Sequence, residues 1–548
     1  MIRRFISIML PAVFLAAGCA QMEEPLAQEA APSDSPLATK CVNTVEKAAD
    51  GTLLLYLEEQ TALKLAQGES IPEWDQVCAE YGIEYVEKLF PKTDDQLSRR
   101  YGLHRWYMVS FPEGGSVERV AEGMAKLNSV TGIQFNTEYE RKFGSEAPVA
   151  WKPFEGRGYG EFNLPFNDPM LSDQWHYINT GDKAVATSAY AGADINVKDA
   201  WTLTAGDPSI IVAIVDEGVK YNHPDLAANM WVNTKEVANG KDDDGNGYVD
   251  DRYGYNFVMN TGVTSWTSNG STGHGTHVAG TIAAVNDNGI GCAGIAGGGK
   301  GKGGVKIMTC QLFDGMNTCS LAMEARAMKY AADNGAVIMN NSWAYAKGSY
   351  TTDSSFKNQF SALINAIDYF EQNAKLEGVI DGGIALFAAG NDGYGVPSYP
   401  GAYYNNICVT SFCSNFTASS FTNYGAGANI CAPGGENNVA GFGFDYGVIS
   451  TVANSDEYGS LMGTSHSTPH VSGCAALGLS YALKLGKRYS AKEFRSLLLS
   501  ATNDVTPYLK GGITLKFSDG SSLALDYPSY KGKLGGGYID AYKLLLQV

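Results

Sequence analysis

The sequence predicts an α/β protein in which helices cover both faces of a mostly parallel sheet. The first observation is that short, uniformly apolar segments alternate with helix-like segments from about residue 172 onward. Such segments are typical of strands buried on both faces. The second is that a carboxylate, Asp216, directly follows one of them, where α/β proteins place their sites. The strand candidates are Ile210–Val215, Val305–Leu312, Ala336–Met339, Ile384–Ala389 and Ile407–Thr410.

Length and charge limit the rest of the chain. The 548 residues exceed what one ordinary domain holds, so a further module is expected beside the sheet domain. The chain has 40 Lys and Arg against 58 Asp and Glu, a formal net charge of −18. We therefore expect no nucleic-acid partner, because such proteins need basic surface for phosphates. An acidic excess is instead compatible with cation binding and solubility.

Residues 1–18 predict a signal peptide. Arg3-Arg4 precedes an apolar run that is too short to span a bilayer comfortably. The run ends in Leu-Ala-Ala-Gly-Cys19, which resembles the lipobox of bacterial lipoproteins, although the Leu stands four residues before the Cys. Lipidation of Cys19 would make a lipid anchor the chain's contact with the membrane, and an ordinary cleaved signal peptide is the alternative. Residues 19–40, rich in Ala, Pro, Glu and Ser, predict a flexible tether.

Residues 41–150 predict the further module. Their patterns follow the order strand, helix, strand, strand, helix, strand, which is typical of a ferredoxin-like α+β domain. This module contains no group of residues that predicts catalysis or metal binding. A loop-rich junction at 142–171 leads to the sheet domain, residues 172–548. The expected strands are Thr52–Leu57, Ile83–Phe90, Arg105–Phe111 and Gly132–Tyr139, and the expected helices are Ile71–Tyr81 and Ser116–Leu127.

Three segments of the sheet domain carry chemistry. In the first, Asp216 follows the apolar strand. In the second, small residues allow close packing of a helix that begins at His274. In the third, Ser465 lies at a helix start with Pro469 in the first turn. Backbone N–H groups at such a start favour developing negative charge. The segments are Ile211–Gly218, His274–Gly280 and Gly463–Gly473.

Together these segments resemble those of the subtilisin-like serine peptidases, or subtilases, in the order Asp, His, Ser. The resemblance covers about residues 172–548. It implies a subtilisin-like catalytic domain that hydrolyses peptide bonds in proteins through an acyl-enzyme. In that scheme Ser465 is the nucleophile, His274 takes and returns its proton, and Asp216 orients the imidazole.

The resemblance also covers groups around the nucleophile. It implies that Asn391 donates from its side chain to the oxyanion, beside the backbone N–H of Ser465. An Asn that only caps a turn is the alternative. Ser342-Trp343-Ala344 corresponds to the segment that pairs with substrate backbone and lines the first specificity pocket. Gly390 and Ser398 are the remaining residues of the expected pocket.

Two residues depart from the family pattern. His466 follows the nucleophile where Met is usual, and Glu217 follows Asp216 in place of a small residue. They leave open a catalytically silent binding protein of the same fold. An esterase or transpeptidase-like acyl transferase using the same triad is a further alternative. The Gly-rich stretch 294–301 approaches a P-loop, but it lacks the Ser or Thr after its Lys and precedes a strand, which argues against nucleotide binding.

Acidic residues between 242 and 251 predict a structural calcium ion. Three Asp and one Asn match positions 1, 3, 9 and 5 of an EF-hand loop, and Gly247 matches position 6, although Tyr253 replaces the usual Glu at position 12. Carboxylates at this density repel one another without a cation, which favours calcium over an empty acidic turn. The family resemblance implies a second calcium site at Asp225 and Asn288. The matching residues of the first site are Asp242, Asp244, Asn246 and Asp250.

The resemblance gives the further module a role as well. Subtilases commonly carry a prodomain of this β–α–β–β–α–β form, which assists folding and inhibits the active cleft until autocleavage. We therefore expect cleavage within 142–171 and a monomeric, exported enzyme that acts on polypeptides, lipid-anchored at the bacterial cell envelope or secreted. Of the 10 Cys, Cys41 and Cys78 could pair with each other. Several Cys of the sheet domain lie in apolar contexts that are typical of buried free thiols.

Overall fold

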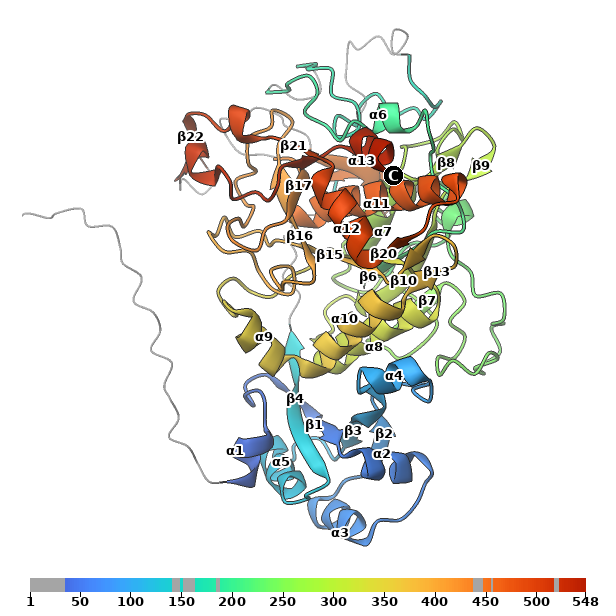
Figure 1. Cartoon of the computed structure of the whole chain (residues 1–548), viewed down its shortest axis with the longest axis vertical. Helices are drawn as coiled ribbons and strands as arrows, with labels where there is room; N and C mark the ends of the chain where they lie inside the picture. Colours follow the sequence, from blue (N-terminus) through green and yellow to red (C-terminus); the bar gives the residue numbers. More distant parts are fainter. Residues whose placement is uncertain are drawn as a thin grey trace, which may run out of the picture.

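The computed structural model describes residues 35–139, 148–150, 163–183, 188–436, 447–454, 457–516 and 522–548. The predicted signal peptide, Cys19 and most of the predicted tether lie outside these ranges. Figure 1 shows an N-terminal module, in blue and cyan, beneath a larger body. Within the described ranges, no helix combines the length and the apolar character needed to cross a membrane.

A sheet of nine strands forms the centre of the larger body. Its order is β21-β24-β17-β16-β15-β12-β6-β10-β7, and all neighbouring pairs are parallel except β21 with β24. Every predicted buried strand lies in this sheet, so the prediction of a mostly parallel α/β sheet is confirmed. The bounds are β6 Ile211–Glu217, β7 Gly254–Asn256, β10 Lys306–Phe313, β12 Ile338–Asn341, β15 Ile384–Ala388, β16 Ile407–Phe412, β17 Ile430–Pro433, β21 Thr502–Asn503 and β24 Tyr538–Ile539.

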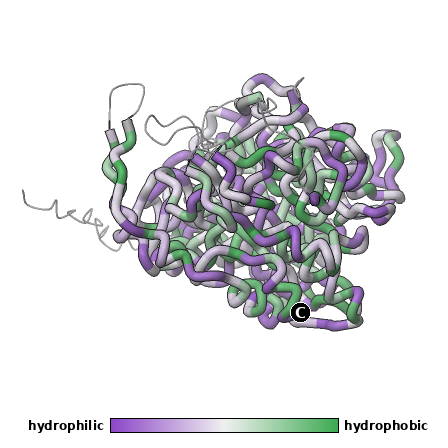
Figure 2. The backbone as a smooth tube through the Cα atoms, turned by 90° about the horizontal axis from the view of Figure 1, so that it is seen from above, coloured by the Kyte–Doolittle hydropathy of each residue, from purple (hydrophilic) through white to green (hydrophobic). Residues whose placement is uncertain are grey.

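Helices cover both faces of this sheet. Along β6, Val212 and Ile214 join the core on one face, whereas Ala213 and Val215 join the core on the other. This alternation follows from the two-residue period of a strand. In Figure 2 hydrophobic stretches, in green, run through the body, and hydrophilic stretches, in purple, recur on its outer loops. The first face carries α7 (His274–Ala283), α11 (Thr464–Leu485), α12 (Ala491–Ser500) and α13 (Ala541–Gln547), and the second carries α8 (Leu321–Asp333) and α10 (Ser361–Asn373).

Short elements complete the larger body. The Gly-rich stretch 294–301 leads into the hairpin of β8 and β9 and opens no helix, so it has no P-loop geometry. The remaining bounds are β5 Val149–Ala150, α6 Val197–Ala200, β8 Gly298–Gly299, β9 Lys302–Gly303, β11 Cys319–Ser320, α9 Asp353–Gln359, β13 Lys375–Leu376, β14 Ile380–Asp381, β18 Val448–Thr451, β19 Tyr458–Leu461, β20 Tyr489–Ser490, β22 Gly512–Lys516 and β23 Ser522–Asp526.

The N-terminal module is built on an antiparallel sheet in the order β4-β1-β3-β2, and β11 of the larger body pairs with the outer edge of β4. All of the predicted strands and helices are present, with shifted ends. The sequence patterns missed the helices α1, α2 and α4. The prediction of a flexible tether was wrong for its last residues, because α1 lies there and Lys40 donates to the carbonyls of Ala125 and Leu127. The bounds are α1 Pro36–Lys40, β1 Ala48–Leu57, α2 Glu59–Ala66, α3 Pro72–Tyr81, β2 Tyr85–Lys88, α4 Gln96–Arg100, β3 Trp106–Ser110, α5 Val117–Ala125 and β4 Val130–Tyr139.

The two faces of the module's sheet have different partners. Leu53 and Leu55 of β1 pack with Trp74 of α3, inside the module. Leu54 and Trp106 face the other way and join the core that includes α8 and α10. The module therefore lies against the larger body through the face of its sheet that carries Leu54 and Trp106, and Figure 1 shows it below α8 and α10.

Side-chain amides of β4 also cap the two helices that the module contacts. Asn136 Oδ1 accepts the backbone N–H of Ala322 at 3.0 Å, in the first turn of α8. Gln134 Oε1 accepts the backbone N–H of Ala362 at 3.2 Å, in the first turn of α10. Such N–H groups have no partner within their own helix, so the module satisfies donors that would otherwise need water.

The cysteines of the described ranges are free thiols. Cys41 and Cys78 are partly buried and unpaired, so the pairing considered for them is not present in this structure. The others are buried: Cys292, Cys310, Cys319, Cys408, Cys413, Cys431 and Cys474. Burial raises the pKa of the Cys310 thiol and so keeps it protonated. These thiols are packing residues, as their apolar sequence context predicts.

Candidate active site

The carboxylate of Asp216 and the imidazole of His274 form a direct pair. Asp216 lies near the carboxyl end of β6, and His274 is the first residue of α7. Asp216 Oδ1 lies 2.7 Å from His274 Nδ1, and both side chains are buried. The close approach requires glycine at position 275, because a Cβ there would lie 2.2 Å from the carbonyl oxygen of Glu217. Asp216 thus fixes the ring at Nδ1 and leaves Nε2 for a reacting group.

Ser465 is held at the start of α11 by two hydrogen bonds with Ser342. Ser465 Oγ donates to the carbonyl of Ser342 at 2.9 Å, and Ser342 Oγ donates to the carbonyl of Ser465 at 2.6 Å. Pro469 lies inside α11, so its expected place in the first turn was wrong. Because Pro469 has no N–H, the Ser465 carbonyl lacks its usual helical donor and accepts the Ser342 hydroxyl instead.

The helices α7 and α11 meet beside these residues. The ring of His466, next to Ser465, lies 5.0 Å from the ring of His274 between centroids. It lies 4.5 Å from the ring of His277, whose Nε2 is 2.9 Å from the carbonyl of Val448. Burial lowers the pKa of His277 to about 3 and that of His466 well below its usual value. The imidazoles of His277 and His466 are therefore neutral and act as packing groups.

Asn391 stands three residues after the end of β15, across from Ser465. Its Oδ1 accepts both the backbone N–H and the hydroxyl of Thr464, each at 2.8 Å. The amide nitrogen Nδ2 is the polar atom of the side chain that remains. Asn391 and Ser465 line one cavity of about 450 Å³. A donor pair facing the same cavity suits an oxyanion.

The same cavity contains most of the predicted pocket residues. Trp343, Ala344 and Gly390 line it, together with Tyr345 and Lys347. Trp343 is buried, and its ring packs against that of Phe387 at 5.5 Å between centroids. Ser342 lies behind the nucleophile, through the hydrogen bonds described above. The position of Ser398 is behind Gly390, where its Oγ accepts from the side chain of Asn423 at 3.2 Å.

Glu217, the departure next to Asp216, is buried and directed at the start of α7. Its carboxylate accepts the backbone N–H of His274 at 2.8 Å and that of Thr272 at 3.0 Å. Its size is therefore accommodated by a specific set of donors. Sequence reasoning did not find this role, because it depends on a helix that begins 57 residues later.

The acidic loop between β6 and β7 brings together only part of the predicted set. Among the described residues, the carboxylate group that could hold a metal ion consists of Glu236, Asp242 and Asp244, whose oxygens lie within 4.8 Å of one another. Asn246 instead donates to Asp251 at 2.9 Å, and Asp250 accepts the N–H of Asn239 at 2.9 Å. Glu236 lies upstream of the EF-hand-like window, so the loop pattern could not reveal it. Oxygen ligands of this kind suit Ca²⁺.

Asp225 and Asn288 also come together, at the loop that follows α7. Asn288 Nδ2 donates to Asp225 Oδ1 at 2.7 Å. Asp168, which the sequence patterns missed, faces the same loop and accepts the N–H of Asp287 at 2.9 Å. Burial raises the pKa of Asp225 to about 7 and that of Asp168 to about 6. Two buried carboxyl groups at one loop are a donor set that a divalent cation fits.

Comparison with known proteins agrees with this geometry. The chain matches the profile described as "Subtilase family" over residues 207–521, which is more than half of its length. It is 32% identical over 332 residues to thermitase of Thermoactinomyces vulgaris, covering 61% of this chain and 96% of thermitase. It is 33% identical over 355 residues to the halolysin-like extracellular serine protease Nep of Natrialba magadii, covering 65% of this chain and 52% of Nep. The chain thus aligns with about half of Nep but with nearly all of thermitase.

A solved structure supports the fold alone. The serine protease of Aeromonas sobria, in complex with its chaperone, superposes with a TM-score of 0.53 at 23% identity. The match covers 74% of this chain and 71% of that one. The family match spans most of the sheet domain and all three segments that hold Asp216, His274 and Ser465. The chain therefore belongs to the subtilase family of serine-type endopeptidases.

Proposed function

We propose that the protein hydrolyses polypeptides with Asp216, His274 and Ser465 as its triad, through an acyl-enzyme. The single observation that carries this proposal is the 2.7 Å pair of Asp216 and His274 beside the helix start that holds Ser465. His274 Nε2 takes the proton of Ser465 Oγ as the hydroxyl attacks the peptide carbonyl. The imidazolium then returns the proton to the leaving amine. In the second half of the reaction His274 takes a proton from water, the water attacks the ester of Ser465, and the proton returns to Ser465 Oγ.

Two donors would stabilise the tetrahedral oxyanion. These are the backbone N–H of Ser465, at the start of α11, and Nδ2 of Asn391. Thr464 holds the opposite atom of that amide, so the side chain is oriented before substrate binds. An oriented donor costs no reorganisation during the reaction, which is why such groups contribute strongly to rate.

The cavity favours an extended polypeptide as the substrate. Trp343, Tyr345 and Ala344 form an apolar wall beside Ser465, with room for one large side chain in about 450 Å³. Asp392 and Lys347 also line it and offer both signs of charge. Backbone groups of 342–344 would pair with the substrate by strand addition.

The N-terminal module is proposed as a ferredoxin-like prodomain, residues 41–150, that inhibits the catalytic domain, residues 172–548. The strand order β4-β1-β3-β2 and the helix caps at α8 and α10 support this. Tyr139, the last residue of β4, pairs with Cys319 of β11. Val149–Ala150 pairs with β19, just ahead of the nucleophile's helix. Cleavage by the enzyme itself is proposed within residues 142–171.

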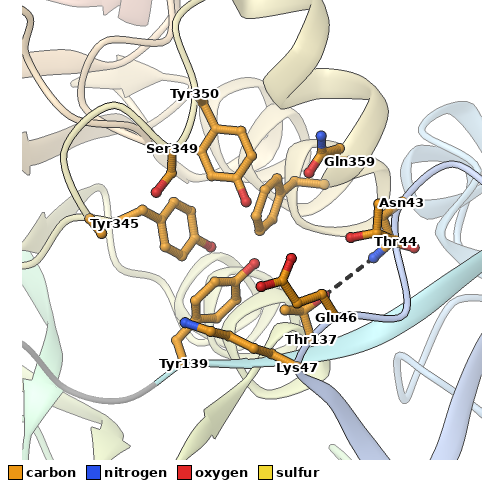
Figure 3. Close-up of a pocket in the computed structure, with 12 residues that line it drawn as sticks. Asn43, Thr44, Glu46, Lys47, Thr137, Tyr139, Tyr345, Ser349, Tyr350 and Gln359 are labelled. Atoms are coloured by element: carbon orange, nitrogen blue, oxygen red, sulfur yellow. Dashed lines mark hydrogen bonds between the residues drawn. The ribbon is translucent and has the colours of Figure 1, made fainter. Parts of the chain in front are cut away.

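An aromatic seam continues from the module to the substrate cavity. Figure 3 shows Tyr139, Tyr345 and Tyr350 directed toward one another at a cavity of about 370 Å³ between the two parts. The rings of Tyr139 and Tyr345 are 4.6 Å apart between centroids. Tyr345 also lines the cavity beside Ser465. Tyr139 of the module thus packs directly on Tyr345, a residue in the wall of the proposed active site.

Calcium is proposed as a structural ion at two places. Glu236, Asp242 and Asp244 would hold one ion, and Asp225 with Asn288 and Asp168 would hold the other. Each ion would neutralise carboxylates that face one another. The proposed leader and lipid anchor at Cys19 would deliver the enzyme to the cell envelope or outside it, in keeping with the word extracellular in the name of Nep.

The proposal is tested by labelling with a serine-directed fluorophosphonate. The full chain is expressed as wild type and as Ser465→Ala, and both are incubated with the probe and with casein. Wild type is expected to be labelled and to degrade casein after losing its module, and Ser465→Ala to do neither. The intact mass of the variant should equal that of the precursor. Equal labelling of both chains would remove Ser465 as the nucleophile.

A further inference from the structure

Glu217 contacts the backbone of the residue that carries the catalytic imidazole. The helix α7 starts at His274, and the preceding residue, Gly273, has no side chain with which to cap it. The N–H of His274 is therefore one of the donors that a helix leaves unpaired. Glu217, from the end of β6, accepts that N–H at 2.8 Å.

The same carboxylate fixes the loop before the helix. It accepts the N–H of Thr272 at 3.0 and 3.2 Å from its two oxygens, and the Thr272 hydroxyl at 3.4 and 3.5 Å. Glu217 is 1% exposed, so these bonds form away from solvent. A hydrogen bond to an ionised carboxylate is stronger than one between neutral groups. The entry into α7 is thus fixed on both sides of Gly273.

Consecutive residues of one strand hold His274 at two points. Asp216 binds the ring at Nδ1, and Glu217 binds the main chain of the same residue. The distance between Asp216 and the imidazole then depends on two anchors that share one backbone segment.

We propose that Glu217 is a positioning residue of the triad, which fixes the main chain of His274 and adds negative charge beside the imidazolium that forms during the reaction. This inference rests on the proposed function of the triad. Among the residues that the structure describes, the titratable groups around His274 are Asp216 and Glu217 from β6, His277 from α7 and His466 from α11. Both neighbouring imidazoles are neutral through burial, so the two carboxylates are the charges that act on the ring.

The test compares the wild type with Glu217→Gln, Glu217→Ala and a matched control, Asp540→Asn. Asp540 caps α13 in the same manner, by accepting the N–H of Lys543 at 2.8 Å, and is remote from the triad in sequence and fold. Each full chain is expressed and allowed to process, and kcat/KM is measured on a peptide substrate across pH. Melting temperature is measured on the same samples.

Glu217→Gln keeps the shape but loses one acceptor and the charge, and kcat/KM is expected to fall about tenfold through kcat. The acid limb of its profile is expected to move to lower pH, because the imidazolium loses a nearby anion. Glu217→Ala is expected to lose about 100-fold. Asp540→Asn should lower the melting temperature without changing either kinetic quantity.

A purely structural role would give a different pattern. Lower melting temperatures for both Glu217 variants, with kcat/KM and the acid limb as in the wild type, would overturn the inference. Loss of folding in both variants would also overturn it. NMR titration of the His274 ring in Ser465→Ala and in the double variant Ser465→Ala with Glu217→Gln gives a readout without turnover. The inference is wrong if the titration midpoint of His274 is the same in both variants. The proposed function is wrong if the fluorophosphonate fails to label the wild type.

Discussion

The two helices that carry His274 and Ser465 start in similar ways but have caps of different charge. Both are preceded by glycine at positive φ, 78° at Gly273 and 142° at Gly463, and neither glycine can cap its own helix. The cap of α7 comes from the last residue of β6, and the cap of α11 comes from the loop that follows β15. At α7 the cap is the Glu217 carboxylate, and at α11 it is the neutral amide of Asn391.

The difference matches the charge that each helix start meets during the proposed reaction. The imidazole of His274 becomes positive, so a carboxylate next to it is favourable. The oxyanion forms at the start of α11, where the helix dipole and free N–H groups favour negative charge. A carboxylate cap there would repel the oxyanion. A neutral amide satisfies Thr464 through its oxygen and leaves its nitrogen to donate.

The largest expected effect breaks the α11 side of this comparison. Asn391→Ala removes one oxyanion donor, and kcat is expected to fall by about 100-fold to 1,000-fold with little change in KM. Asn391→Asp keeps an acceptor for Thr464 but places a charge at the oxyanion, so its kcat should fall further. Steady-state kinetics on a peptide substrate measure both. If Asn391→Asp retained more activity than Asn391→Ala, a carboxylate at the start of α11 would not repel the oxyanion as proposed.

A smaller effect is expected from the residue that orients this amide. Thr464→Val keeps the backbone N–H but loses the hydroxyl that donates to Asn391 Oδ1 at 2.8 Å. We expect kcat to fall about tenfold, because a looser donor gives up part of its preorganisation. Thr464→Ser retains the hydroxyl and serves as the control. Equal rates for the Val and Ser variants would show that the backbone N–H alone orients Asn391.

The parallel sheet was predictable because it depends on local pattern. Apolar runs such as Ile210–Val215 became parallel strands, and the helix predicted to begin at His274 does begin there. Signals of this kind lie within a few residues of each other. Pro469 shows the limit: a proline was expected near the helix start, yet Ser342 supplies the donor that allows it deeper in the helix.

The residues that sequence reasoning missed act across long separations. Glu217 caps a helix 57 residues away, and Asp168 faces a loop 119 residues away. Glu217 was noticed only as a departure beside Asp216, and no spacing rule links either carboxylate to its distant partner. Glu236 lies nearer to its partners, but it stands outside the EF-hand pattern that drew attention to the loop. Long-range partners of single polar groups need coordinates.

The other end of α7 provides the next test. Asp225 and Asn288 meet at the loop that follows this helix, so calcium there would hold one end of α7 while Glu217 holds the other. An ion at about 1,000 times its Kd stabilises the folded chain by about 4 kcal/mol. Chelation is therefore expected to lower the melting temperature by several degrees, and added Ca²⁺ to restore it.

Asp225→Asn should make part of that shift disappear, because one ligand charge of this site is removed. Asp504→Asn, at a carboxylate remote from either loop, is a suitable control. Melting curves with chelator and with added Ca²⁺ compare the three chains. An unchanged melting temperature of the wild type on chelation would count against both proposed calcium sites.

The smallest effect concerns a buried glutamate at the start of α8. Glu217 accepts backbone N–H groups, whereas Glu324 accepts the hydroxyl of Tyr345, and burial raises the pKa of Glu324 to about 8 from 4.5. A folded chain with the higher pKa binds the proton more tightly than the unfolded chain. The stability gained is fully present below about pH 4.5 and is lost as pH rises through about 8.

Glu324→Gln should remove this dependence, because the amide stays neutral at every pH. The melting temperature of the wild-type precursor should fall relative to the variant between about pH 5 and about pH 9. Since Tyr345 also packs on Tyr139 of the module, the same ionisation is expected to loosen the aromatic seam. If the melting temperatures of the two chains changed in the same way with pH, Glu324 would not be the source of the pH dependence. A melting temperature of the wild type that falls away from that of Glu324→Gln as pH rises would show that burial holds Glu324 protonated at neutral pH.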